Sequence, residues 1–339
     1  MTEAFQPREF IPFNGNQFGL VYAGALTENV EGAVNIHSIE YPYRDFTAVA
    51  NVYTPAGYDV AKSYPAVVVA HPNGGVKEQV AGTYAQKLAE AGYIALAFDA
   101  AYQGESGGMP RSTDWPENRV EDIHRAADIL LQYPGVDPER VGILGICGGG
   151  GYTFKAVQTD KRFRAVATLS LFNSGEVRRE GFRGSQVDSI QERLRAAAKA
   201  RQAEAAGEPA ALTPNMCETA TPEQADAMPY DLYREGYYYY GRDCAHPGST
   251  FSYTVSSLIE LAAFDSRDGA ELIDVPLLMM IGSRADTGYM SIDCYERAVN
   301  APHRELFEIP GATHIQTYWK PEYVQQATDK LTAFFGQYL

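Results

Sequence analysis

The chain has 339 residues, of which 45% are hydrophobic and 21% charged, with a formal net charge of −15. This is the composition of a globular protein, long enough for one large domain or for a domain with an insertion. The acidic balance disfavours nucleic acid as a partner, because phosphate backbones bind clustered Lys and Arg. No stretch approaches the roughly 18 apolar residues of a membrane helix, and residues 1–10 lack the pattern of a signal peptide. We therefore expect a cytoplasmic protein with no membrane partner.

The cysteines are widely spaced and form no CxxC pair, so we expect reduced thiols that are either core residues or reactive groups. They are Cys147, Cys217, Cys244 and Cys294. No set of His, Cys and carboxylate residues has the spacing of metal ligands. The sequence therefore predicts neither a metal nor a cofactor.

Strand-like and helix-like segments alternate along most of the chain, which predicts a doubly wound, mostly parallel α/β sheet with helices on both faces. Three β-rich stretches occupy residues 34–71, and the first 33 residues fit no element. Helical patterns then alternate with apolar strands, in the order helix 80–92, strand 93–100, helix 115–135, strand 140–147, helix 148–160 and strand 163–171.

The alternation stops for about a hundred residues and resumes with a buried strand near residue 275. The intervening segment 174–274 is rich in Ala, charges and Tyr, and most of it favours helix. We expect it to be an inserted helical lid, with residues 34–173 and 275–339 forming one core and residues 1–33 an N-terminal extension. The sequence predicts that the lid controls substrate choice.

A Gly-x-Cys-x-Gly sequence at 145–149 joins the end of an apolar strand to the start of a helix. This is the context of a nucleophile elbow, which needs glycines because the turn is sharp and crowded. The helix N-terminus would favour a thiolate, so we expect Cys147 to be the nucleophile, with a lowered thiol pKa. The alternative is a buried Cys in a Gly-rich turn. A second match, Gly-x-Ser-x-Gly around Ser106, is followed by loop and is a weaker candidate.

A cysteine nucleophile needs a base, and we favour His314, which follows the last predicted strand in a loop. The chain's other histidines lie in predicted strands, helices, the lid or an earlier loop: His37, His71, His124, His246 and His303. Asp286 follows the strand at 276–282 and is the candidate acid that would orient the histidine; it could instead cap the next helix. The order nucleophile, acid, histidine is that of the α/β hydrolases.

Acyl transfer also needs donors aimed at the oxyanion. The loop at 71–75 follows the strand before the first crossover helix, where Asn73, or alternatively Gly74, would supply one backbone N–H. Gly148, directly after the nucleophile, would supply the other. A plain tight turn is the alternative for this loop.

These motifs resemble the dienelactone-hydrolase-like branch of the α/β hydrolases, in which Cys replaces Ser at the elbow. The resemblance lies in AHPNGGVKEQ, LAFDAAYQGESGG, LGICGGGGY, IGSRADT and GATH. It implies an α/β-hydrolase fold and the roles given above to Cys147, Asp286 and His314. The chain differs from the compact members in its long lid and N-terminus, which leaves lactone specificity open.

We therefore expect a hydrolase that cleaves an ester, lactone or thioester of a small molecule through an acyl-cysteine intermediate. A non-hydrolytic reaction of the same fold, such as cyclisation, dehydration or acyl transfer, is the main alternative, and a binding module is another. Candidate substrate-binding residues are Tyr102, Tyr238 and Tyr239. The tyrosine run at 237–240 would line either an aromatic pocket or an interface of a homo-oligomer.

Overall fold

The computed structural model describes residues 4–339 and contains a nine-stranded sheet in the order β1-β2-β3-β5-β4-β6-β7-β8-β9. β1, β2 and β3 pair antiparallel, and all neighbours from β5 to β9 are parallel. The predicted α/β class is confirmed. The strands are β1 Gln6–Pro7, β2 Asn35–Tyr43, β3 Phe46–Thr54, β4 Tyr64–Ala70, β5 Ile94–Phe98, β6 Val136–Ile146, β7 Ala165–Leu169, β8 Leu277–Gly282 and β9 Arg304–Ile309.

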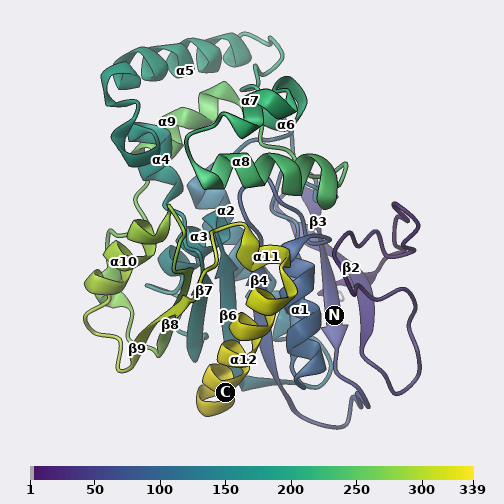
Figure 1. Ribbon diagram of the computed structural model, residues 1–339. Helices are drawn as coiled ribbons and strands as arrows, with labels where there is room; N and C mark the ends of the chain where they lie inside the picture. The colour runs from purple at the N-terminus through teal and green to yellow at the C-terminus, as the bar shows by residue number, and fades with distance from the viewer. Residues whose placement is uncertain (1–3) are drawn as a thin grey trace.

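Helices cover both faces of this sheet (Figure 1). α1 and α12 pack together on one face, while α2 and α3 pack together on the other. α10 packs on β8 and β9. The bounds are α1 Val80–Glu90, α2 Pro116–Leu130, α3 Gly148–Ala156, α10 Gly288–Arg297, α11 Gln316–Trp319 and α12 Pro321–Tyr338. None of the helices within residues 4–339 has the length and apolar character needed to cross a bilayer.

The segment between β7 and β8 is mainly helical, yet β7 and β8 are parallel neighbours in the sheet. Figure 1 shows its helices stacked above the sheet. They are α4 Ser174–Glu180, α5 Ile190–Ala205, α6 Met216–Thr219, α7 Pro222–Asp226, α8 Asp231–Tyr238 and α9 Leu258–Ala263, and α8 continues into a π-helix, Tyr239–Asp243. The role of this segment as a lid stays a prediction.

Residues 4–33, to which the sequence assigns no element, pack against the core. β1 extends the sheet by only two residues beside β2. Phe18, Leu20 and Tyr22 are buried, and the Tyr22 hydroxyl donates to Gln86 Oε1 at 3.0 Å in α1. The segment shows no hydrophobic periodicity because it forms almost no regular helix or strand. Contacts of individual side chains hold it against the core instead.

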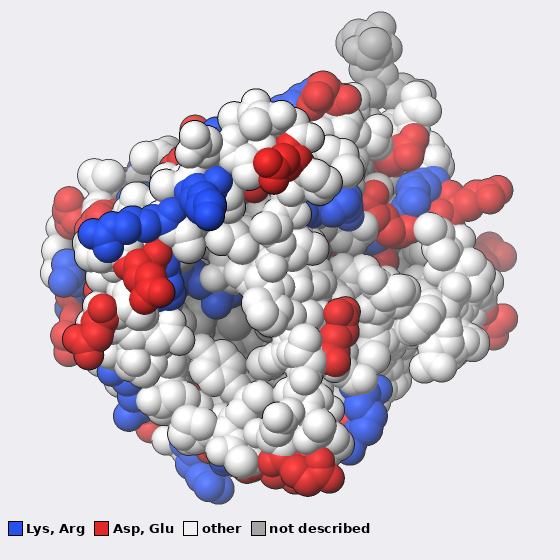
Figure 2. All heavy atoms as spheres, turned by 90° about the horizontal axis from the view of Figure 1, so that it is seen from above, with Lys and Arg blue, Asp and Glu red and all other residues white. Residues whose placement is uncertain are grey.

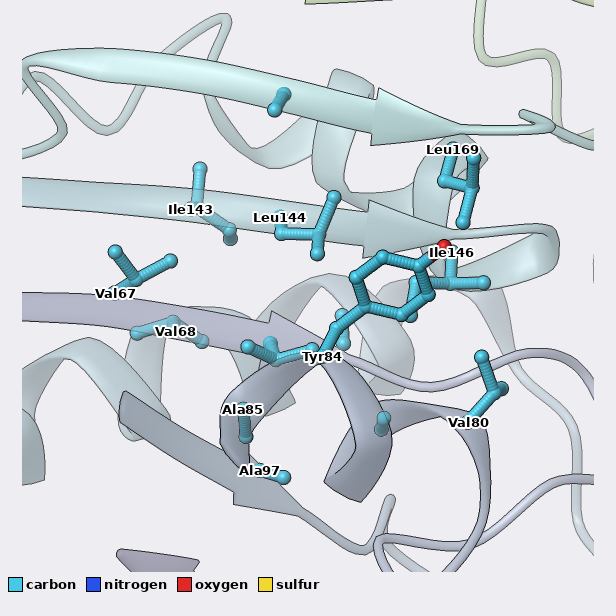
Figure 3. Close-up of a cluster of buried hydrophobic side chains, with 14 of the residues drawn as sticks. Val67, Val68, Val80, Tyr84, Ala85, Ala97, Ile143, Leu144, Ile146 and Leu169 are labelled. Atoms are coloured by element: carbon cyan, nitrogen blue, oxygen red, sulfur yellow. The ribbon is translucent and has the colours of Figure 1, made fainter. Parts of the chain in front are cut away.

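A core of aliphatic side chains lies between α1 and the parallel strands (Figure 3). Val67 and Val68 of β4 and Ile143 and Leu144 of β6 are fully buried there. The ring of Tyr84 from α1 crosses this cluster, and its hydroxyl donates to the carbonyl of Thr317 at 2.7 Å. Through this hydrogen bond the core supports the short helix α11, which contains Thr317.

We expect Tyr84→Phe to lower the free energy of unfolding by about 1–2 kcal/mol, because the buried Thr317 carbonyl loses its partner. Urea denaturation of the purified protein measures this change. Tyr338→Phe is the matched control, since that hydroxyl only accepts an exposed hydrogen bond from Gln337. Equal stability of the two variants would contradict the structural role of the Tyr84 hydroxyl.

Candidate active site

Cys147 lies at a strained turn between β6 and α3, with φ 54° and ψ −122°. Glycines surround it because the backbone leaves no room for side chains. A Cβ at Gly145 would collide with Thr153, and a Cβ at Gly148 would collide with the Asn73 side chain. A Cβ at Gly149 would collide with the backbone of residues 70–71. This is the strand-to-helix geometry of a nucleophile elbow.

The sulfur of Cys147 is buried and lies among hydrogen-bond donors. Burial raises the pKa of the Cys147 thiol, and the Tyr318 hydroxyl and the backbone N–H groups of Gly148 and Asn73, which favour the thiolate, only partly oppose it. The expectation of a lowered thiol pKa is therefore wrong. The helix N-terminus does face the sulfur, but the loss of water outweighs it.

His314 is fully buried and has a partner on each ring nitrogen. Nδ1 lies 2.6 Å from Thr287 Oγ1, and Nε2 lies 2.7 Å from the Tyr318 hydroxyl. Burial lowers the pKa of the imidazole to about 3. Because Tyr318 also hydrogen-bonds to Cys147, the connection from thiol to imidazole runs through the tyrosine hydroxyl.

Asp286 makes no hydrogen bond with His314 in the structure of residues 4–339. Its Oδ2 accepts from the backbone N–H of Leu232 at 3.1 Å, in the first turn of α8. Its Oδ1 is buried and has no partner, and burial raises the pKa of this carboxyl group. The N-terminus of α8 attracts the carboxylate, as helix N-termini do. The side chain that reaches His314 belongs to the next residue, Thr287.

The loop predicted to supply oxyanion donors lies over the elbow. The backbone N–H groups of Asn73 and Gly148 lie close enough to the sulfur to lower the pKa of the thiol. The Asn73 side chain donates to Ser174 Oγ at 2.8 Å, which fixes the loop. Gly74 has a φ of 72°, and its carbonyl accepts from the N–H of Thr250. The geometry thus favours Asn73 over Gly74 as the first donor.

A cavity of about 60 Å³ opens onto the sulfur. Its walls are mostly apolar, with the exceptions of one Arg and one Asn. The lining residues are Asn73, Cys147, Phe172, Arg178, Met216, Leu232, Tyr233, Gly236, Tyr240, Phe251 and Ile315. Most of them come from the helical segment 174–274, which supports a role for that segment in substrate choice.

The three tyrosines expected at the substrate do not line this cavity. The Tyr238 hydroxyl donates to Asp226 at 2.8 Å on the exposed side of α8. Tyr239 packs against Tyr318, with ring centroids 5.5 Å apart. Tyr102 packs against Phe46 at the far end of an earlier loop. Within α8 and the π-helix that continues it, the helical repeat turns Tyr233 and Tyr240 towards the cavity, in place of Tyr238 and Tyr239.

Sequence reasoning missed Tyr318 and Thr287. Tyr318 stands four residues after His314 and lies within α11, so helical spacing places it beside the histidine. Thr287 directly follows the residue chosen as the acid, and only the path of the backbone shows which of the two faces the ring. Ser106, the weaker nucleophile candidate, is buried, and its hydroxyl donates to the Asp99 carbonyl at 2.8 Å.

Three carboxylates, those of Glu78, Asp99 and Glu105, lie close enough together to hold a cation. The ammonium of Lys77 already occupies their centre, at 2.6, 2.8 and 2.5 Å from the three groups respectively. Asp99 also accepts from the Lys77 backbone N–H at 2.9 Å. The cluster is therefore a buried ion network that fixes the chain just beyond the loop at 71–75.

Comparisons with known proteins show the family of the chain. Residues 49–170 match the dienelactone hydrolase family. The protein YcjY of Escherichia coli (strain K12) is 36% identical over 293 residues, which cover 86% of this chain and 94% of YcjY. The chain belongs to the dienelactone-hydrolase-like family of α/β hydrolases. Hydrolase is the activity class that this membership indicates.

Two further relatives bear on the site. The crystal structure of PA2218 from Pseudomonas aeruginosa superposes with a TM-score of 0.82 at 30% identity, covering 92% of this chain and 96% of that one. The thiohydrolase aneE of Aspergillus aculeatus is 36% identical over 129 residues, which cover 38% of this chain and 41% of aneE. PA2218 shares the fold of this chain, and aneE is named for thiohydrolase activity.

We expect iodoacetamide to alkylate Cys147 with an apparent pKa above the ordinary thiol value of about 8.5, because only the thiolate reacts. A raised pKa means that the thiolate fraction is small at pH 7 and grows through the alkaline range. Mass spectrometry of alkylation rates from pH 6 to 10.5 measures the curve. Tyr318→Phe should move it to still higher pH, since one donor to the sulfur is lost. A rate that stays flat between pH 6 and 9 would indicate a preformed thiolate and contradict this prediction.

Proposed function

We propose that the chain hydrolyses a carboxylic ester, lactone or thioester of a small organic molecule through an acyl-cysteine intermediate on Cys147. The observation that carries this proposal is the sulfur at the elbow, which faces both an open cavity and two backbone N–H donors. Two such donors can stabilise the negative oxygen of a tetrahedral intermediate. The thiohydrolase name of one relative supports thioesters as one substrate class.

In the first half of the reaction, the sulfur of Cys147 attacks the carbonyl carbon and its proton leaves through Tyr318. The tyrosine hydroxyl takes the thiol proton as it gives its own proton to Nε2 of His314, 2.7 Å away. The carbonyl oxygen becomes an oxyanion held by the N–H groups of Asn73 and Gly148. When the carbonyl re-forms, the bond to the alcohol or thiol breaks, and the proton returns from His314 to that leaving group.

In the second half, water attacks the thioester carbonyl of the acyl-enzyme. His314 takes a proton from the water through the same hydroxyl and returns it to the Cys147 sulfur, which leaves as the thiol. The first half starts from an uncharged thiol and the second from the acyl-cysteine, and in both the imidazole starts uncharged, consistent with the raised pKa of Cys147 and the low pKa of His314. The charges thus arise only along the reaction path.

Two residues, Asp286 and Thr287, are candidates for fixing the orientation and tautomer of His314. Asp286 as the acid of a Cys-His-Asp triad stays a prediction, and its present contact is with α8. We propose that Thr287 holds the tautomer in this conformation by accepting the proton of Nδ1, which leaves Nε2 free to accept from Tyr318. Asp286 would act on the ring only after a rotation that releases α8.

We expect Cys147→Ala to lose nearly all turnover of p-nitrophenyl esters, lactones and acyl-thioesters, because no other side chain occupies the elbow. Mass spectrometry of the wild-type protein during turnover should show the mass of the acyl group on Cys147. Ser106→Ala is the matched control and should retain most activity, since Ser106 only bonds to the backbone. A folded Cys147→Ala protein with wild-type turnover would overturn the proposal.

Product analysis in ¹⁸O-labelled water separates hydrolysis from the alternative reactions of this fold. Hydrolysis places one labelled oxygen in the carboxylate product. An acyl group on Cys147 together with an unlabelled cyclised or transferred product would show that Cys147 is the nucleophile and that the reaction is acyl transfer instead of hydrolysis. An absence of both adduct and product would favour a binding module.

We expect Thr287→Val to reduce kcat more than KM, by about tenfold or more, because the valine removes the partner of Nδ1 and frees the wrong tautomer. Asp286→Asn keeps the shape of the carboxylate and tests the predicted triad acid. With Asp286 held by α8, this substitution should change KM through the lid and leave the pH profile of kcat in place. A large loss of kcat in Asp286→Asn with little effect in Thr287→Val would restore the Cys-His-Asp triad.

A further inference from the structure

Gln79 directly precedes α1 and carries a fully buried amide group that bonds to two other parts of the chain. Its Oε1 accepts from the backbone N–H of Val76 at 3.1 Å, and its Nε2 donates to the backbone carbonyl of Cys244 at 2.7 Å. Because an N–H group lies on one side of the amide and a carbonyl on the other, one orientation satisfies both neighbours. The bond to Cys244 spans 165 positions of the sequence and links the core to the helical segment 174–274.

The bond to Val76 holds the loop that lies over the elbow. Val76 comes directly after this loop, and its carbonyl also accepts from the backbone N–H of Gln79 at 3.2 Å. Within the loop the N–H of Gly75 donates to the carbonyl of Pro72 at 3.1 Å, which closes a tight turn. The backbone N–H of Asn73, inside that turn, lies close to the elbow sulfur. A shift of Val76 is therefore passed through the turn to the Asn73 donor.

The bond to Cys244 holds the end of the π-helix that continues α8, because Cys244 directly follows its last residue. Carbonyls at the end of a helix have no partner within the helix, and Gln79 supplies one here. Tyr240 of this π-helix lines the catalytic cavity, and Tyr239 packs against Tyr318 with ring centroids 5.5 Å apart. The π-helix is thus a wall of the cavity and a support for the hydroxyl that connects thiol to imidazole.

Burial makes both bonds of Gln79 hard to replace. Figure 2 shows the molecule from the side of the 174–274 helices, with charged side chains spread around a hollow. Gln79 and Val76 do not reach this surface, since both are fully buried, and Cys244 is buried as well. Water cannot take the place of a hydrogen bond lost in such surroundings, so the orphaned N–H and carbonyl must find other partners. We expect the loop and the π-helix to move when the amide is removed.

We propose that Gln79 is a positioning residue that fixes the Asn73 N–H over the elbow relative to the cavity wall formed by the π-helix. This inference rests on the proposed function of Cys147. A donor stabilises the oxyanion only when it lies at hydrogen-bond distance from the place where the negative oxygen forms. Displacement of the loop weakens that contact in the transition state, while the contacts of the bound substrate with the cavity change less. Loss of Gln79 therefore lowers kcat more than it raises KM.

Gln79→Met tests this role, because methionine has a similar length and makes neither hydrogen bond. Removal of one oxyanion donor costs roughly 100-fold to 1,000-fold in kcat, and a displaced donor keeps part of its contact. We expect kcat for p-nitrophenyl acetate to fall about tenfold, with a smaller change in KM. Alkylation by iodoacetamide gives a readout that needs no turnover. Since the Asn73 N–H lowers the pKa of the Cys147 thiol, the pH curve of alkylation should move to higher pH in this variant.

Gln86→Met is the matched control, since Gln86 is also a buried glutamine of α1 but holds the N-terminal segment instead of the site. Its Oε1 accepts from the Tyr22 hydroxyl at 3.0 Å and from the Leu26 N–H at 3.1 Å, and its Nε2 donates to the Gly24 carbonyl at 2.9 Å. This variant should lower the free energy of unfolding as Gln79→Met does. It should leave kcat and the alkylation curve of the wild-type protein unchanged, which separates positioning from stability.

Gln79→Asn is the second variant, and it decides the question should Gln79→Met fail to fold. It carries the same amide on a side chain one methylene shorter, so it reaches only one of its two partners, and its kcat should lie between those of the wild type and Gln79→Met. The inference is overturned if folded Gln79→Met matches Gln86→Met in kcat and in the alkylation curve. Wild-type values of both in folded Gln79→Asn would overturn it as well. Failure of the proposed function would show instead as turnover in Cys147→Ala, a result that the Gln79 variants do not affect.

Discussion

The positive φ of Cys147 is the constraint on which the rest of the site depends. At φ 54° the chain turns from β6 directly into α3, and the sulfur projects from the sheet into the cavity instead of packing in the core. The turn requires Gly145, Gly148 and Gly149, because the loop at 71–75 and the start of α3 crowd against it. That crowding also brings the N–H groups of Asn73 and Gly148 to the sulfur. The same geometry therefore creates the strain and the donors that a reaction at the sulfur would use.

Exclusion of water determines the electrostatics of the site. Burial raises the pKa of Cys147 and lowers the pKa of His314 to about 3, so both groups are uncharged at neutral pH. A hydroxyl is a suitable connection between two uncharged groups, because Tyr318 can donate and accept at once. Charge that develops at the sulfur or the oxyanion is stabilised more strongly in such surroundings than in water. Arg178 lies at the boundary of this cavity as a cation, and its charge favours the thiolate of Cys147.

The helical segment between β7 and β8 contributes to the site in two ways. It supplies most of the cavity wall, including Tyr233, Tyr240 and Phe251. It also contacts the loops of the core, since the N-terminus of α8 binds Asp286 and the carbonyl of Gly74 accepts from Thr250. Movement of this segment would thus change both the shape of the cavity and the position of the candidate acid.

The sequence by itself determined the features that depend on local backbone chemistry. Alternating apolar strands and amphipathic helices specify a parallel sheet, and glycines around a Cys at the end of an apolar strand specify the elbow, because each pattern reflects a short-range steric requirement. The position of His314 near the elbow likewise follows from its place in the loop after the last strand.

Only the tertiary structure decided which side chains meet. Thr287 reaches His314 while Asp286 turns to α8, and Tyr318 lies between His314 and Cys147. Tyr233 and Tyr240 line the cavity. Most of these contacts join segments far apart in the chain. Whether Asp286 or Thr287 faces His314 depends on the path of the backbone, which no local pattern encodes.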